Sequence, residues 1–196
     1  MNYYSINCED GNIFSGPKLC KPKIHRDERG YFFESWNSEN FQKATKKEHI
    51  FAQDNESLSF YGVLRGLHYQ LNPQPQGKLI KVTYGKIFDV FVDIRKSSNT
   101  FMKYYGVELS DENKFQLWIP KGFAHGFLTL SEYAIVNYKV TNPWAKDLER
   151  TILWNDKEIN IHWPMSKLKL DKPKLSEKDS SGQELRELAK NGEIFE

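Results

Sequence analysis

The sequence predicts an all-β fold, a sandwich or a barrel, and two observations support this. From about residue 60 to residue 165, short runs rich in Val, Ile, Phe and Tyr alternate with Gly, Pro, Asn or Asp at the spacing of strands and turns. Few helical patterns interrupt these runs, and 39% hydrophobic residues in a chain of 196 provide for one sizeable core. We therefore expect a single domain over residues 1–196, with a β core at about 50–165 and a C-terminal extension at 166–196.

Seven runs in this region are predicted to be strands: Tyr61–Gln70, Lys78–Tyr84, Lys86–Ile94, Tyr104–Leu109, Phe115–Ile119, Ala124–Leu130 and Tyr133–Val140. The third run is largely apolar, as expected of a strand covered on both faces, yet it contains Asp89 and Asp93. Buried carboxylates need a compensating partner, so these acids require a specific reason to be there. Gly85, between two of the strands, is expected to adopt a positive φ.

Helices are expected only outside the β core. The segment Ser38–Lys43 predicts a short helix capped by Ser38. Near the end of the chain, Ser181–Glu184 has the form of a capping box, and Gly192 is a suitable stop. The helix between them has one apolar face, made of Leu185, Leu188 and Ala189. We interpret the segments that flank the core as decorations, for which a dimer interface is one natural use.

The composition excludes several classes of function. Lys plus Arg total 28 and Asp plus Glu total 26, a net charge of +2, which is too balanced for most nucleic-acid or membrane-surface binding. No apolar run approaches the roughly 20 residues of a membrane span, and the N-terminus lacks a signal-peptide pattern. We expect a soluble, cytoplasmic protein with no nucleic-acid or membrane partner. Cys8 and Cys20 are too few for a disulfide framework and are expected to be free thiols.

Two histidines lie in unusual strings. Arg65 and His68 belong to one predicted strand, where alternation would place their side chains on opposite faces unless a bulge intervenes. A histidine at such a position, considered alone, is more often half-buried and hydrogen-bonded to a neighbouring strand than catalytic. His125 follows a Pro-x-Gly turn at the start of a strand, and this string is similar to a cupin signature.

Metal-binding cupins supply a His-x-His pair, a Glu and a further His to one ion. Here Gln70 stands where the second histidine would be, and Thr129 stands four residues beyond His125 in place of an asparagine. Two histidines alone make a poor metal site, so we expect a metal-free pocket and no cofactor.

Without a metal, the chemistry would depend on an acid–base set of side chains: His68, His125, Lys78, Asp89, Arg65 and Tyr138. Histidine, with a pKa of about 6.5, accepts a proton readily at neutral pH, and tyrosine, at about 10, is suited to donate one. A lysine stabilises a developing oxyanion. The set suits removal of a proton next to a carbonyl and reprotonation from the other face. Taken singly, Tyr138 is more often an ordinary strand residue, and Lys78 could equally be a solvated strand-end lysine. Asp89 could be an exposed edge acid, but its apolar neighbours Phe88 and Val90 argue against that.

Seven motifs occur in the order His25–Glu34, Gln53–Asn55, Arg65–Gln70, Gly77–Lys78, Phe88–Arg95, Gly122–Phe127 and Trp154–Asp156. Through them the string from Arg29 to Pro164 resembles the dTDP-4-dehydrorhamnose 3,5-epimerase family, metal-free cupins that act on nucleotide-linked 4-keto-6-deoxy sugars. The resemblance implies a cupin jelly-roll barrel with short flanking helices, including a C-terminal helix. It also implies a cofactor-independent, homodimeric isomerase in surface-polysaccharide biosynthesis.

The resemblance further implies roles for individual residues. His68 would take the proton alpha to the ketone, Asp179 would orient this histidine, and Tyr138 would deliver a proton to the opposite face. Lys78 would hold the C4 enolate oxygen. The same polar end of the pocket would contain His125 and Asp89. The residues that match nucleotide-diphosphate-binding positions are Arg29, Glu34, Gln53, Asn55 and Arg65, the first two contributed by the partner subunit.

Trp144 stands where many family members have a tyrosine that stacks beside the sugar or the base. The nucleotide therefore stays open, and a GDP-linked 6-deoxy-heptose is compatible with the pattern. Family members invert C3 and C5 or C3 alone, and the presence of Tyr138 favours inversion at both carbons. Two further alternatives are a sugar-nucleotide-binding cupin without turnover and a metal-dependent cupin isomerase or dioxygenase. A base and a proton donor in one pocket favour an enzyme over a pure binder.

Overall fold

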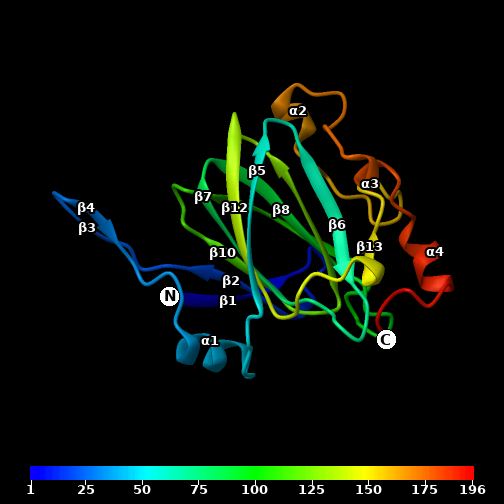
Figure 1. Cartoon of the computed structure of the whole chain (residues 1–196), viewed down its shortest axis with the longest axis horizontal. Coiled ribbons are helices and arrows are strands. Elements are labelled where there is room, and N and C mark those ends of the chain that lie inside the picture. The colour runs from blue at the N-terminus through cyan, green and yellow to red at the C-terminus, as the bar shows by residue number, and fades with distance from the viewer.

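Two antiparallel sheets enclose the core of the computed structural model, which describes residues 1–196 (Figure 1). The six-stranded sheet has the order β1 (Asn2–Asn7), β2 (Ile13–Lys21), β10 (Gln116–Ile119), β7 (Lys78–Tyr84), β12 (Tyr133–Val140) and β5 (Gln53–Phe60). The five-stranded sheet has the order β13 (Glu149–Thr151), β6 (Leu64–Gln70), β11 (Phe123–Thr129), β8 (Lys86–Asp93) and β9 (Tyr104–Ser110). The architecture is the predicted cupin jelly roll.

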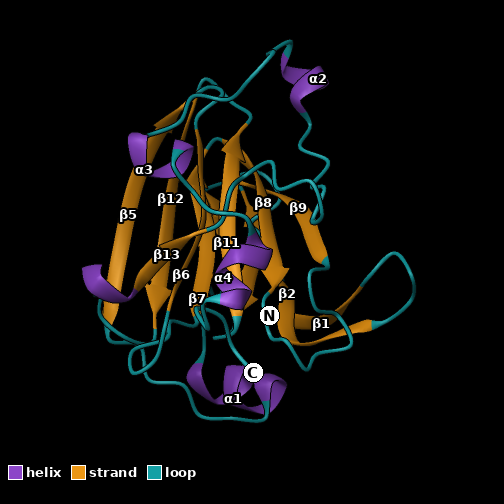
Figure 2. Cartoon of the chain, turned by 90° about the vertical axis from the view of Figure 1, so that its right-hand side faces the viewer, coloured by secondary structure: helices purple, strands orange, loops and turns teal.

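The core has two layers, one on each side of the five-stranded sheet. The inner layer lies between the sheets and includes Ile80, Leu117 and Phe91. The outer layer forms where the C-terminal segment covers the back of the five-stranded sheet, as Figure 2 shows with α4 (Leu185–Lys190) in front of it. Leu185 from this helix packs in the same cluster as residues of β8. Strand β8 is thus covered on both faces, which explains its nearly continuous apolar sequence.

The two acids of β8 are both compensated. Asp93 accepts hydrogen bonds from Arg95 Nε at 2.8 Å and from Ser98 Oγ at 2.6 Å. Burial alone would raise the pKa of Asp93, but these bonds outweigh burial and lower it. Asp89, which has no exposed surface, pairs with His125 and belongs to the site described below.

Most strand predictions are confirmed. Strands β7 and β12 have the predicted bounds, and the other five predicted strands are displaced at their ends by a few residues. The largest shift is at β6, because Tyr61 and Gly62 form the turn that follows β5. Gly85 has a φ of 76°, as predicted. Cys8 and Cys20 are free and buried, which confirms the expected thiols.

The interpretation of the N-terminal region as a decoration is wrong. Strands β1 and β2 belong to the six-stranded sheet, where β2 pairs with β10. These strands contain many polar residues because β1 is the edge strand and β2 lies next to it, so they lack the apolar runs by which the central strands were predicted. Strand β5 was missed for the same reason, since its outward side chains are exposed.

Both predicted helix caps differ in the structure. Helix α1 (Ser38–Thr45) is capped by Asn37, whose side chain accepts from the backbone N–H of Asn40 at 3.0 Å, and not by Ser38. No capping box forms before α4, because Ser181 instead ends α3 (Glu177–Ser180). The predicted apolar face is confirmed, since Leu185 and Leu188 are buried. None of the helices, which also include the single turn α2 (Met165–Leu168) and a 3-10 turn at Lys146–Leu148, has the length and apolarity needed to cross a membrane.

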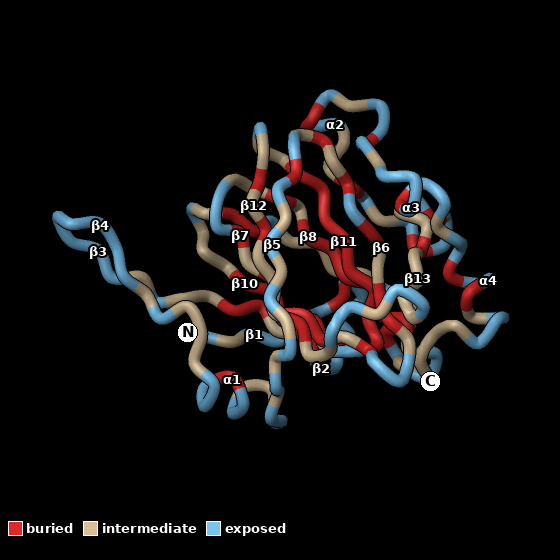
Figure 3. Tube along the Cα trace, viewed as in Figure 1, coloured by how far each residue is buried: buried red, intermediate tan, exposed pale blue.

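One hairpin leaves the body of the molecule. Strands β3 (His25–Asp27) and β4 (Gly30–Phe32) form an arm that projects beyond the six-stranded sheet (Figure 1). All residues of both strands are exposed, as the pale blue arm in Figure 3 shows. On β4 of this arm, Tyr31 is 50% exposed and Phe32 is 73% exposed.

Candidate active site

A cavity of about 280 Å³ lies where the open end of the barrel meets α3. Both sheets contribute to its wall, together with the loop after β12 and the helix α3. The lining residues are Ser57, Arg65, His68, Lys78, His125, Phe127, Tyr138, Trp144, Glu149 and Lys178. The six residues of the predicted acid–base set include five in this wall, and the sixth, Asp89, bonds directly to one of them.

His68 and Asp179 form a hydrogen-bonded pair at the edge of the cavity. The Nε2 atom of His68 lies 2.6 Å from Asp179 Oδ1. Asp179 is positioned by the cap of α3, since its other carboxylate oxygen accepts from Ser176 Oγ at 2.7 Å, and by the backbone N–H of Gly66 at 3.1 Å. The second ring nitrogen of His68, Nδ1, makes no hydrogen bond within the chain and is the atom available to a substrate.

The pKa values of this pair favour a neutral histidine beside an ionised acid. Burial lowers the pKa of His68, and the hydrogen bond that its ring donates to Asp179 raises it by less. Burial alone would raise the pKa of Asp179, but the hydrogen bonds from His68 and Ser176 outweigh it and lower the pKa to about 2. A neutral imidazole backed by a carboxylate is ready to accept a proton and to remain as an imidazolium.

A β-bulge brings Arg65 and His68 into the same cavity. Strand β11 advances by two residues from His125 to Phe127 while β6 advances by three, from His68 to Arg65. The extra residue reverses the alternation of faces, and Gly66 accommodates it with a φ of 127°. The placement of Arg65 and His68 on opposite faces, which regular alternation predicts, is therefore wrong.

Lys78 brings a buried ammonium group to the cavity from the opposite sheet. Its Nζ donates to the carbonyl oxygen of His68 at 3.3 Å, and the residue is 9% exposed. Burial lowers the pKa of Lys78 to about 8, while Glu149 and Asp89 favour the charged form. This environment excludes the solvated strand-end interpretation of Lys78.

His125 and Asp89 form a second buried pair on neighbouring strands of the five-stranded sheet. His125 Nε2 lies 2.9 Å and 3.1 Å from the two carboxylate oxygens of Asp89. Burial raises the pKa of Asp89, and His125 and Lys78 oppose that rise. Because Asp89 is fully buried, it is not an edge acid, and it reaches the cavity only through His125.

Tyr138 faces His68 from the other sheet. It lies on β12, where it pairs with Asn55 of β5 and with Ile80 of β7. Burial raises the pKa of its phenol, and the positive charge of Arg65 opposes this, so the group holds its proton at neutral pH. A base and a proton donor thus line one cavity from two different sheets.

Of the residues expected to bind the nucleotide diphosphate, Arg65 and Trp144 line the cavity, and Gln53 and Asn55 are linked to Trp144 by hydrogen bonds. Gln53 Oε1 accepts from the backbone N–H of Trp144 at 3.0 Å, and Gln53 Nε2 donates to Asn55 Oδ1 at 2.7 Å. Trp144 keeps 55% of its surface exposed, so its indole offers a face for stacking. Arg65 is held by Ser59 Oγ at 2.9 Å.

Arg29 and Glu34 do not reach this cavity in their own chain. Arg29 lies on the exposed arm, where its guanidinium pairs with Asp27 at 2.6 Å. Glu34 follows the arm and accepts weak hydrogen bonds from Asn37 and Asn40. Two of the expected binding residues are therefore separated from the others within one chain.

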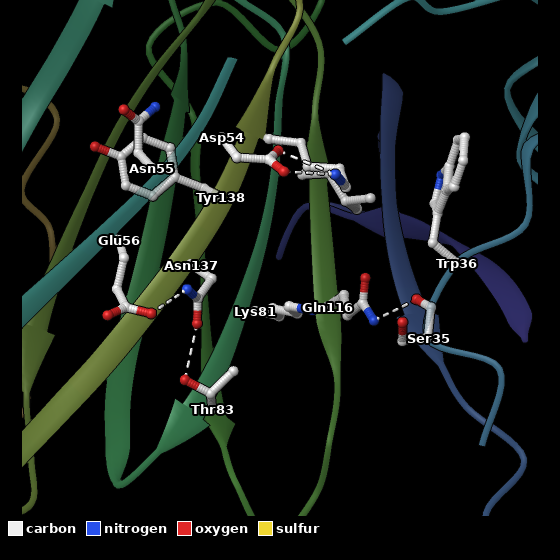
Figure 4. A pocket seen from close by; sticks show the side chains of 12 residues that line it. Ser35, Trp36, Asp54, Asn55, Glu56, Lys81, Thr83, Gln116, Asn137 and Tyr138 are labelled. Atoms are coloured by element: carbon white, nitrogen blue, oxygen red, sulfur yellow. Dashed lines mark hydrogen bonds and ion pairs between the residues drawn. The ribbon is translucent and has the colours of Figure 1, made fainter. Parts of the chain in front are cut away.

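A larger groove of about 510 Å³ lies on the outer face of the six-stranded sheet (Figure 4). Across its strands Lys139 pairs with Asp54 at 2.9 Å and Asn137 donates to Glu56 at 2.7 Å, while Asn55 and Tyr138 also border this groove. It contains none of the histidines. We therefore place the candidate active site in the smaller cavity, which contains the acid–base set.

Four cavity residues were missed by the sequence analysis, namely Ser57, Phe127, Glu149 and Lys178. Glu149 and Lys178 form an ion pair of 3.0 Å across the cavity wall. Lys178 directly precedes Asp179, so the expected role of Asp179 was the one sequence signal that could have identified it. Glu149 lies on a three-residue strand that no pattern predicted. His, Cys, Asp and Glu side chains do not gather in groups of three that would hold a metal ion.

Comparison with known proteins gives a consistent result. The profile of the family described as dTDP-4-dehydrorhamnose 3,5-epimerase matches residues 13–187. A protein of that name from Shigella flexneri is 56% identical over 183 residues, which cover 93% of this chain and 95% of that protein. Its counterpart from Salmonella typhimurium is 53% identical over 163 residues, 83% and 87% of the two chains.

Solved structures agree with these relatives. A dTDP-6-deoxy-D-glucose-3,5-epimerase from Legionella pneumophila, crystallised with dTDP-4-keto-L-rhamnose, superposes with a TM-score of 0.87 and 42% identity. The match covers 99% of this chain and 98% of that one.

Proposed function

The chain belongs to the dTDP-4-dehydrorhamnose 3,5-epimerase family, and on this premise we propose how its own side chains carry out the reaction. It is an isomerase that inverts C3 and C5 of a dTDP-linked 4-keto-6-deoxy sugar. The observation that supports the mechanism is the placement of His68 and Tyr138 on opposite sheets around one cavity. A role in surface-polysaccharide synthesis stays a prediction.

His68 is the proposed base. The hydrogens on C3 and C5 are acidic because both carbons adjoin the C4 ketone. His68 Nδ1 removes one of them, the C–H electron pair forms the enolate, and the ring becomes an imidazolium that the ionised Asp179 stabilises through Nε2. The Lys78 ammonium, with the His125 and Asp89 pair beside it, stabilises the negative C4 oxygen.

Tyr138 completes the inversion. Its phenol donates a proton to the planar carbon from the face opposite His68, and the configuration at that carbon reverses. The phenolate then regains a proton from solvent while His68 releases the one it took. The same sequence at the second carbon gives the 3,5-epimer. Loss of Tyr138 alone leaves proton exchange without inversion, whereas loss of His68 removes both.

The nucleotide diphosphate would occupy the mouth of the cavity. Gln53 and Asn55 offer amide groups to the nucleotide, Trp144 offers a ring face for stacking, and Arg65 suits bidentate contact with phosphate oxygens. The names of the relatives and the dTDP sugar bound in the Legionella pneumophila structure favour a dTDP sugar over the GDP-linked alternative. Inversion at C3 alone and binding without turnover are outcomes of the next test.

We expect this protein to incorporate deuterium at both C3 and C5 when dTDP-4-keto-6-deoxyglucose is incubated in heavy water. The Tyr138→Phe variant keeps the base but loses the proton donor, so it should exchange deuterium while forming less than a tenth of the inverted product. NMR spectra of the sugar would report both events. Label at C3 alone would indicate a 3-epimerase, no label would indicate a pure binder, and an unaltered Tyr138→Phe product would remove Tyr138 from the mechanism.

The homodimer is also a proposal, and the position of the arm supports it. Arg29 and Glu34 are exposed in their own chain and separated from the cavity, while the arm and β5 expose Phe32, Leu58 and Phe60. In a two-fold dimer each arm would cross to the other subunit and deliver its Arg29 to that subunit's cavity. The site would then be complete only in the dimer.

Mixed dimers test this arrangement. The His68→Asn chain lacks the base, and the Arg29→Ala chain lacks a phosphate contact in the partner's site. Co-refolding equal amounts should produce heterodimers with one complete site, and activity should recover to about one quarter of the wild-type value for random pairing. If Arg29 serves its own subunit, mixing will restore nothing beyond the average of the two variants.

A further inference from the structure

Ser57 carries an unsatisfied hydroxyl in the wall of the catalytic cavity. Three buried side-chain polar atoms have no hydrogen-bond partner: Trp36 Nε1, Ser57 Oγ and Thr129 Oγ1. Of these residues, only Ser57 lines the cavity that contains His68 and Tyr138. Buried polar atoms without a partner are rare in folded proteins, and a bound ligand is one cause of such an exception.

The inner face of β5 shows why this hydroxyl stands out. Alternation places Gln53, Asn55, Ser57 and Ser59 in one row along that face. Gln53 and Asn55 bond to each other, and Ser59 Oγ accepts from Arg65 Nε. Ser57 is the one member of the row without a hydrogen bond from its side chain.

The position of Ser57 in this row indicates its ligand. On one side lies Asn55, which is expected to contact the nucleotide, and on the other lies Ser59, which holds the guanidinium of Arg65. A diphosphate joins the nucleotide to the sugar, so it must pass between these two positions. A serine side chain has three staggered χ1 positions, and a change between them redirects the hydroxyl without moving the strand.

We propose that Ser57 Oγ donates a hydrogen bond to a diphosphate oxygen of the bound nucleotide sugar. The proposal rests on the function proposed above, and it adds a phosphate-binding residue that acts before the chemical step. Hydrogen bonds to charged acceptors are stronger than neutral ones, and an atom that is unsatisfied in the free protein gains the whole of that bond on binding. The contact should therefore raise affinity without altering stability.

The test compares Ser57→Ala with the wild type by calorimetric titration with dTDP, which has the diphosphate but no sugar. We expect the Kd for dTDP to rise roughly 10-fold to 100-fold, the range for one charge-assisted bond, and KM for the sugar nucleotide to rise in parallel with kcat unchanged. The melting temperature of the free variant should stay equal or increase, because the substitution removes an unpaired buried hydroxyl. Ser5→Ala, an exposed position on β1, serves as the control.

Three results would overturn the proposal. Wild-type affinity of Ser57→Ala for dTDP would show that no phosphate bond is lost. Unchanged dTDP affinity with an increased KM for the sugar nucleotide would assign Ser57 to the sugar. A melting temperature lowered by several degrees would mean that the hydroxyl has a structural partner. Because dTDP undergoes no reaction, the titration gives its answer even if the proposed roles of His68 and Tyr138 fail.

Discussion

The His68→Asn variant should lose epimerase activity by about 10²- to 10⁴-fold, the range for removal of a general base. Asparagine approximates the size of the ring and retains a hydrogen-bonding group for Asp179, but it cannot accept the proton from C3 or C5. Deuterium exchange into the sugar should disappear together with product formation, because both begin with the same proton transfer. NMR in heavy water measures both quantities in one sample.

Two controls make this result specific. His162→Asn changes an exposed histidine that has no part in the cavity and should leave the rate unaltered. Titration with dTDP should give the same affinity for His68→Asn as for the wild type, which would show that the variant is folded and binds. Exchange that persists at the wild-type rate in His68→Asn would assign the base to another residue.

The acid side of the pH profile of kcat/KM should report the titration of His68. The reaction needs neutral His68, and burial lowers its pKa below the usual value of about 6.5. Activity should therefore be present above that pKa and should fall as the pH decreases through it. Removal of the Asp179 charge in Asp179→Asn takes away the partner that raises this pKa, so the acid limb should move to lower pH while the plateau rate decreases.

The Lys78→Met variant should have the second largest effect, a loss of about 10²- to 10³-fold in kcat, because it removes the charge next to the enolate oxygen. Methionine has a similar length without the ammonium group. Lys78→Arg retains the charge and should keep more activity than Lys78→Met. The ion pair of Lys86 with Glu108 lies at the surface, so Lys86→Met is the matched control and should behave as wild type.

We expect the fall of kcat/KM at high pH to report the deprotonation of Lys78. Its pKa is lowered to about 8, and the charged form is the active one, so kcat/KM should fall as the pH rises through about 8. This limb should be absent from the residual activity of Lys78→Met. The melting temperature of Lys78→Met should equal or exceed the wild-type value, since an apolar side chain replaces a buried charge. A lower melting temperature with an unchanged pH profile would make Lys78 a structural residue.

The site shows where local sequence patterns were sufficient and where they failed. Lys78 and Tyr138 lie on two strands whose bounds were predicted without error, so their place in the barrel followed from the apolar pattern around them. Arg65 was assigned to the wrong face because one inserted residue reverses alternation, and no local pattern signals a bulge whose partner strand is distant in sequence. Glu149 escaped notice because a strand of three residues has too few positions to show a period.

The sequence by itself determined the all-β character, the positions of the central strands along the chain, the free thiols and the types of side chain available for catalysis. These features depend on the alternation of neighbouring residues and on composition, which are local properties. Tertiary structure alone decided that His68 meets Asp179 across 111 residues, that Asp89 is buried against His125, and that Arg29 lies outside its own cavity. Such contacts depend on the packing of sheets and of the C-terminal segment, in which residues far apart in sequence become neighbours.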